Sequence, residues 1–171
     1  MNSLIEINNL STYFESGAGT VKAVDDISFR IREGETVCIV GESGCGKSIT
    51  AMSIMGLVDE PHGKVVGGQI RFGDKDLLKI SKEEMRRIRG NDISIIFQEP
   101  MSSLNPVITI GRQIMEPLML HQKLNKKQAY ARALELIELV GISRAEQIAA
   151  SYPHQLSGGM LQRIMIAIAI S

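Results

Sequence analysis

The chain has 171 residues, of which 44% are hydrophobic, and its 19 Lys plus Arg balance 19 Asp plus Glu. This length suits one domain with a buried core, and the zero net charge excludes recognition of nucleic acid or an anionic membrane by overall charge. The longest apolar run, 164–170, is far below the ~18 residues that span a bilayer, and no signal peptide opens the chain, so we expect a cytosolic protein. Cys38 and Cys45 lack metal-ligand spacing and are expected to stay reduced.

The first part of the chain predicts strands that alternate with helices. Apolar residues in a strand pattern predict strands at 4–10 and 27–31. The runs at 36–40 and 92–98 are apolar enough to be buried on both faces, which is typical of strands in a parallel sheet. A helix is expected over 49–57. This alternation indicates the α/β class.

Two local signals lie between these segments. Residues 67–77 predict a hairpin with Gly73 and Asp74 as its turn. Ser81 and Glu84 have the spacing of a capping box and predict the start of a short basic helix.

Residues 109–152 predict helices alone. Asn125 and Gln128 have capping-box spacing, and so do Ser143 and Glu146, which predict the start of the next helix. After the first box, residues repeat at helical spacing, namely Tyr130, Ala133, Leu134, Ile137 and Val140. This segment is expected to form a helical lobe outside the sheet.

The stretch GESGCGKS at 41–48 carries the strongest chemical signal. It fits G-x-x-x-x-G-K-[ST] between a predicted strand and a predicted helix, the context of a phosphate-binding loop. Its glycines let successive backbone N–H groups face phosphate oxygens together with the helix N-terminus. Lys47 would reach the β and γ phosphates, and Ser48 would place its hydroxyl on Mg²⁺. The candidate phosphate-binding residues are Gly41, Glu42, Ser43, Gly44, Cys45, Gly46, Lys47 and Ser48.

Two further segments narrow the class of phosphate-loop protein. Gln98 ends the predicted strand in IIFQEP, and Ser157, Gly158 and Gly159 open an apolar helix. The Ser157 hydroxyl and the glycine N–H groups would form an anion site at the positive end of that helix dipole. The alternatives are an ordinary helix N-cap for Ser157 and a solvated loop amide for Gln98.

The stretches VGESGCGKS, FQEPMSSLNP and YPHQLSGGM resemble the ATP-binding subunits of ABC transporters, and more narrowly those of oligopeptide, dipeptide and nickel importers. The resemblance extends over the whole chain. It implies a P-loop ATPase with an antiparallel β subdomain and an inserted helical subdomain. The β subdomain and phosphate-loop core would occupy 1–98, the helical subdomain about 99–155, and the signature motif with its helix 156–171.

The resemblance also implies how ATP and Mg²⁺ are bound. Lys47 and Gln98 would be the catalytic residues within this chain, and Ser48 and Gln98 would contact Mg²⁺. Phe14 would stack on the adenine ring. Tyr13 is the alternative for that role, and packing against the sheet is the alternative function for either aromatic residue.

The implied partners are a second ATP-binding subunit, two integral membrane subunits and, indirectly, a solute-binding protein, without nucleic acid. In a head-to-tail dimer of identical or different subunits, 157–159 would meet the γ phosphate of ATP held by the partner. The membrane subunits would dock on the helical lobe, where Met101, Leu104 and 115–119 are candidate contacts. The subunit would lie peripherally on the cytoplasmic side of the cell membrane.

The resulting hypothesis is ATP hydrolysis that drives uptake of peptides or a similar small solute. In the family an Asp-Glu pair and a histidine follow the signature helix, so the general base is expected beyond residue 171. Two strands that separate 36–40 from 92–98 are expected there too, which implies an incomplete core sheet and poor stability of residues 1–171 alone. A soluble ATPase of DNA repair or translation, and a nucleotide-binding fragment without hydrolysis, are the alternative functions.

Overall fold

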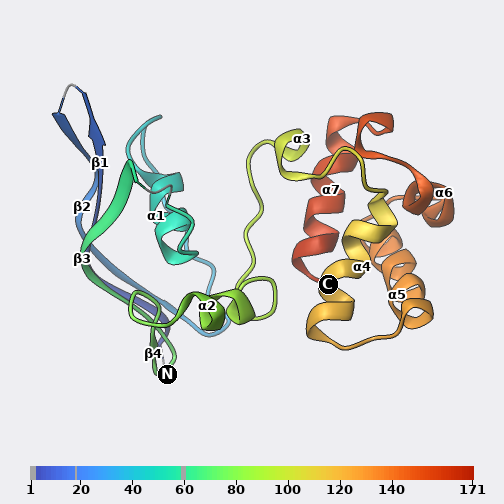
Figure 1. The fold of residues 1–171 in the computed structure, drawn as a ribbon, viewed down its shortest axis with the longest axis horizontal. Coiled ribbons are helices and arrows are strands. Elements are labelled where there is room, and N and C mark those ends of the chain that lie inside the picture. Colours follow the sequence, from blue (N-terminus) through green and yellow to red (C-terminus); the bar gives the residue numbers. More distant parts are fainter. Residues whose placement is uncertain (1–2, 18, 59–60) are drawn as a thin grey trace. The chain divides into compact units, whose positions relative to one another are not determined.

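The computed structural model describes residues 3–17, 19–58 and 61–171. The chain divides into two compact units, Met1–Arg86 and Arg87–Ser171 (Figure 1). The first unit contains an antiparallel sheet and the second contains helices, so the implied β and helical subdomains are both present. The subdomain boundary at residue 98 stays a prediction.

The sheet of the first unit has four strands in the order β2-β1-β3-β4, and every pair is antiparallel. The strands are β1 (Ser3–Ser16), β2 (Gly19–Arg32), β3 (Gly63–Phe72) and β4 (Lys75–Asp76). The strands predicted at 4–10 and 27–31 are confirmed, and each belongs to a longer strand. The predicted hairpin is confirmed as well, because Phe72 pairs with Lys75 across Gly73 and Asp74.

The prediction of buried strands at 36–40 and 92–98 is wrong. Among the described residues neither segment pairs with a strand, and 92–98 makes one isolated bridge, from Ile93 to Arg89. Val40 is 83% exposed. A strand needs a neighbour for its backbone N–H and C=O groups, and apolar composition alone does not supply one. The incomplete core sheet that the resemblance implies is confirmed for the described residues.

Two helices belong to the first part of the chain. Helix α1 (Lys47–Ile54) follows the glycine-rich loop and covers part of 49–57, where the sequence predicts a helix. Helix α2 (Lys82–Ile88) spans the sequence boundary between the units. Its predicted cap is present, because the Ser81 hydroxyl oxygen accepts a hydrogen bond of 3.1 Å from the Glu84 N–H.

The helices of the second unit share one apolar core. They are α3 (Pro100–Ser103), α4 (Ile110–His121), α5 (Lys126–Leu139), α6 (Ala145–Ala150), the 3₁₀ turn η1 (Pro153–Gln155) and α7 (Gly158–Ala169). Fully buried side chains from three of these helices are Ile110, Ile114, Leu118, Ala133, Ile137 and Leu161. No helix among the described residues has both the length and the apolar character that crossing a membrane requires.

Of the helix starts predicted in this unit, the one at Asn125 is confirmed and the one at Ser143 is wrong. The capping box at α5 is confirmed: Asn125 Oδ1 accepts from the Gln128 N–H at 3.0 Å, and Gln128 Oε1 accepts from the Asn125 N–H at 3.1 Å. Tyr130 does not join the buried face, because it is 42% exposed. The helix start predicted at Ser143 is wrong, since Arg144 in a left-handed conformation (φ 58°) is the N-cap of α6.

Candidate phosphate-binding site

The loop 41–48 turns the chain directly into α1. Gly44 and Gly46 adopt left-handed backbone conformations with φ of 83° and 91°, which glycine reaches without the strain that a side chain would cause. Within the loop the Cys45 N–H donates to the Glu42 carbonyl at 3.3 Å. The sequence therefore places glycine where the turn into the helix needs it.

The first turn of α1 presents backbone donors. Gly46 is the N-cap, no side chain among the described residues caps this end, and the first turn contains no acidic residue. Thr50 holds the turn together, because its hydroxyl and its N–H both donate to the Gly46 carbonyl, at 3.0 and 2.8 Å. Uncapped N–H groups at a helix N-terminus carry partial positive charge. Ser48 lies exposed in this turn.

The Lys47 side chain folds back over the loop. Its Nζ donates to the carbonyl oxygens of Gly41 and Glu42 at 2.8 and 2.7 Å, and lies 3.5 Å from Cys45 Sγ. A cation, helix N–H groups and the Ser48 hydroxyl thus lie within eight consecutive residues. Cations and helix N-terminal N–H groups are the groups that proteins use to bind phosphate oxygens, so this loop is the candidate phosphate site.

Two contacts attach α1 to the sheet. A methyl group added at Gly46 would overlap the carbonyl oxygen of Ala23 on β2, so only glycine allows this approach. Thr12 on β1 and Ser53 on α1 share a buried hydrogen bond of 2.8 Å between their hydroxyl oxygens. Neither contact is predicted by a motif in the sequence. Thr12 and Ser53 are polar residues at positions that face the core, and this feature of the sequence could have indicated a buried hydrogen bond.

The two aromatic candidates for adenine stacking lie side by side on β1 and make different contacts. The Phe14 ring is half-buried against Gly63 on β3: a methyl group added at Gly63 would lie 2.5 Å from Phe14 Cε1. Tyr13 instead donates a hydrogen bond to Asp25. Phe14 therefore packs against the sheet in this structure, and its adenine role stays a prediction.

The other candidate residues belong to the second unit. Gln98 is exposed at a bend that precedes α3. Ser157 is the N-cap of α7, and its Oγ accepts from the Met160 N–H at 3.4 Å. A methyl group added at Gly158 or Gly159 would meet nothing within 4 Å, so open space adjoins this helix end. Ser157 therefore acts as a helix cap, and its anion role stays a prediction.

The second unit also carries an apolar groove of about 520 Å³ along α4. Its lining residues are Ile108, Arg112, Met115, Glu116, Met119, Leu120 and Lys126. Of the candidate contacts, Met115 and Met119 line this groove and Met101 is 59% exposed. Leu104 is 5% exposed and belongs to the core, so it offers no surface to a partner.

Residues 24–171 match the ABC transporter family, and the chain belongs to this family. It is 57% identical over 171 residues to the oligopeptide transport ATP-binding protein AppD of Bacillus subtilis strain 168, covering 100% of this chain and 52% of AppD. It is 50% identical over 170 residues to the dipeptide transport ATP-binding protein DppD of the same organism, covering 99% and 51%. The chain spans about half the length of these relatives.

Solved structures agree with this assignment. The dimeric ATP-binding cassette MJ0796, in a post-hydrolysis state bound to ADP and Pi, matches with a TM-score of 0.86 and 28% identity over 97% of this chain and 68% of that one. The protein cbiO1 of Clostridium perfringens matches with a TM-score of 0.72 at 23% identity over 99% of this chain and 62% of that one, which supports the fold alone. The fold is that of an ABC ATPase cassette.

Proposed function

We propose that this chain is the ATP-binding part of an ABC importer subunit that couples ATP binding and hydrolysis to uptake of peptides or a similar small solute. The geometry of the loop 41–48 carries the proposal, because it gathers a cation and uncapped helix N–H groups at one place. The names of AppD and DppD, which are oligopeptide and dipeptide transport proteins, support the class of solute.

Lys47 and Ser48 have separate parts in nucleotide binding. The Lys47 ammonium would exchange the carbonyls of Gly41 and Glu42 for β- and γ-phosphate oxygens, and Ser48 would hold Mg²⁺ through its hydroxyl. Mg²⁺ bound with ATP would neutralise charge on the phosphates. The exposed Ser48 hydroxyl in the first turn of α1 fits this ion, because Mg²⁺ commonly binds through few protein ligands, phosphates and water.

The remaining roles rest on the family resemblance. Phe14 would contact adenine, Gln98 would contact Mg²⁺ and the attacking water, and the corner 157–159 would meet ATP on a second, head-to-tail subunit. Exposure of Gln98 and of 157–159 supports these roles, as does the dimeric state of MJ0796. Hydrolysis is proposed for the complete dimeric subunit, because no residue assigned here serves as the general base.

The groove along α4 supports membrane subunits as partners. Met115 and Met119 offer adaptable apolar contacts, and the charged residues Arg112, Glu116 and Lys126 line the same groove. An amphipathic helix that protrudes from an integral membrane subunit would fit such a surface. The subunit would then lie on the cytoplasmic side of the cell membrane, and a solute-binding protein would act with it only indirectly.

The test is peptide uptake by cells or vesicles that contain the complete subunit together with its membrane subunits. Lys47→Ala should abolish ATP-dependent uptake of labelled peptide, whereas Lys79→Ala, whose side chain is 78% exposed, should preserve it. Purification of a soluble ATPase without membrane subunits, and with no effect on uptake, would favour the alternative class of repair or translation ATPases.

A further inference from the structure

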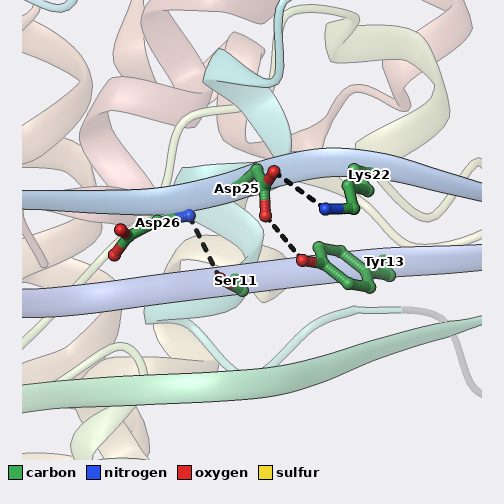
Figure 2. Close-up of polar contacts among 5 residues, drawn as sticks. All are labelled: Ser11, Tyr13, Lys22, Asp25 and Asp26. Atoms are coloured by element: carbon green, nitrogen blue, oxygen red, sulfur yellow. Dashed lines mark hydrogen bonds and ion pairs between the residues drawn. The ribbon is translucent and has the colours of Figure 1, made fainter.

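Three side chains form a polar cluster on the ribbon of β1 and β2 (Figure 2). The Tyr13 hydroxyl donates to Asp25 Oδ1 at 2.5 Å, and Lys22 Nζ donates to Asp25 Oδ2 at 3.2 Å. The same ammonium lies 5.3 Å from the centroid of the Tyr13 ring, within the range of a cation–π contact. The hydrogen bonds from Tyr13 and Lys22 lower the pKa of Asp25, and the bond to Asp25 raises the pKa of Lys22, so both charges are retained near neutral pH.

The cluster encloses a β-bulge. Thr12 pairs with Val24 and Tyr13 pairs with Lys22, so Ala23 has no partner on β1. Such an extra residue bends its strand and re-aims the groups around it. The Asp25 carboxylate joins Lys22, on one side of the extra residue, to Tyr13 on the opposite strand, and thereby closes the ribbon around Ala23.

The bulge is also where the ribbon meets the phosphate loop. The carbonyl of Ala23 lies against the Cα atom of Gly46, the N-cap of α1, and a Val24 methyl group lies beside it. On the other strand, Thr12 bonds to Ser53 in the same helix. The extra residue Ala23 and its neighbours Thr12 and Val24 are therefore the residues that contact α1.

We propose that Tyr13, Lys22 and Asp25 are positioning residues for nucleotide binding: they hold the bulge at Ala23 and, through the contact of Ala23 with Gly46, set the N-terminus of α1 to receive phosphate. This inference rests on the proposed function. An exposed ion pair of this kind contributes little to the free energy of unfolding. Loss of the cluster should therefore affect ligand affinity while the protein stays folded.

The test uses Tyr13→Phe and Lys22→Met in the purified complete subunit, with affinity measured by titration calorimetry for MgATP and for inorganic tripolyphosphate. Each substitution should weaken both ligands about 2- to 5-fold, because each removes one exposed hydrogen bond of the cluster. Lys22→Arg should restore affinity, since it keeps the cation over Tyr13. Tyr130→Phe, which removes the hydroxyl of an exposed tyrosine on α5, is the matched control and should bind like the unsubstituted protein.

Several outcomes would overturn the proposal. One such outcome is unchanged affinity of Tyr13→Phe and Lys22→Met for both ligands, at a temperature where circular dichroism shows both variants folded. The cluster would then be a surface contact without a role in nucleotide binding. Weaker MgATP binding with unchanged tripolyphosphate binding would place the effect at the adenine and not at the phosphate loop. Failure of the unsubstituted protein to bind MgATP would instead overturn the proposed function itself, and the positioning role with it.

Discussion

Lys47 is held by neutral backbone oxygens and not by a carboxylate. Its ammonium bonds to the carbonyls of Gly41 and Glu42, and none of the ion pairs in the described part of the chain includes it. A carbonyl competes with phosphate less strongly than a carboxylate would, because it carries no net charge. The Lys47 ammonium is therefore not neutralised by a carboxylate and is available to bind an anion. A salt bridge to a carboxylate would compete with that binding.

The charge of Asp25, unlike that of Lys47, is stabilised by hydrogen bonds from neighbouring side chains. Hydrogen bonds from Tyr13 and then from Lys22 hold the pKa of its carboxyl below 3.8. The unfolded chain therefore takes up a proton at higher pH than the folded chain does, so the contribution of Asp25 to stability is present above pH 3.8 and lost as the pH falls through the lower, folded pKa.

The expected result is a pH-dependent effect of Asp25→Asn on the midpoint of unfolding. At pH 7 the variant should unfold at a slightly lower denaturant concentration than the unsubstituted protein, and this gap should close as the pH falls below 3.8. Asp74→Asn, at the tip of the β3–β4 turn, is the control. A gap that stays constant from pH 7 to acid conditions would contradict the charged role of Asp25.

At the scale of elements, helix caps and the hairpin at Gly73 and Asp74 were predictable, and pairing between segments distant in the sequence was not. The caps at Ser81 and Asn125 are correct because each depends on side chains three residues apart, which the sequence displays. The segments 36–40 and 92–98 are not strands, because their partners are not set by their own composition. The start of α6 at Arg144 was missed, since its left-handed backbone conformation has no reliable residue signal.

In the candidate site too, features set by neighbouring residues were predictable and features set by strand pairing were not. The loop 41–48 was predictable because its motif is contiguous and its glycines serve the local backbone. The bulge at Ala23 and the cluster around Asp25 were not, since they depend on the register of β1 against β2. Register is set by many residues along both strands, so a short motif does not display it.

The groove along α4 gives a prediction for partner binding. Met119→Asp would place a charge in an apolar contact and should reduce co-purification of the complete subunit with its membrane subunits, while ATP affinity is unchanged. Leu139→Asp is the matched control, because Leu139 is 68% exposed on the same unit and does not line the groove. Equal loss of co-purification in both variants would show that the groove is not the docking surface.

For the whole molecule, the unpaired apolar segments predict self-association of residues 1–171. Val37, Ile39 and Val40 are 39%, 47% and 83% exposed, and the backbone beside them is not paired with a strand in the described chain. Exposed apolar segments of high β propensity favour contacts between chains. Sedimentation should show species larger than the monomer, and Val40→Lys should reduce them. A monomeric chain with one cooperative thermal transition would contradict this expectation.

The proposed ATP-dependent function of the whole molecule depends on phosphate binding by the loop 41–48. The most direct measurement is the equilibrium affinity for MgATP of the complete subunit in three forms: unsubstituted, Lys47→Ala and the surface control Lys79→Ala. We expect Lys47→Ala to bind at least about tenfold more weakly, because it loses the ammonium that contacts the phosphates, and Lys79→Ala to bind like the unsubstituted protein. Equal affinity of all three proteins would contradict the assignment of this loop as the nucleotide site.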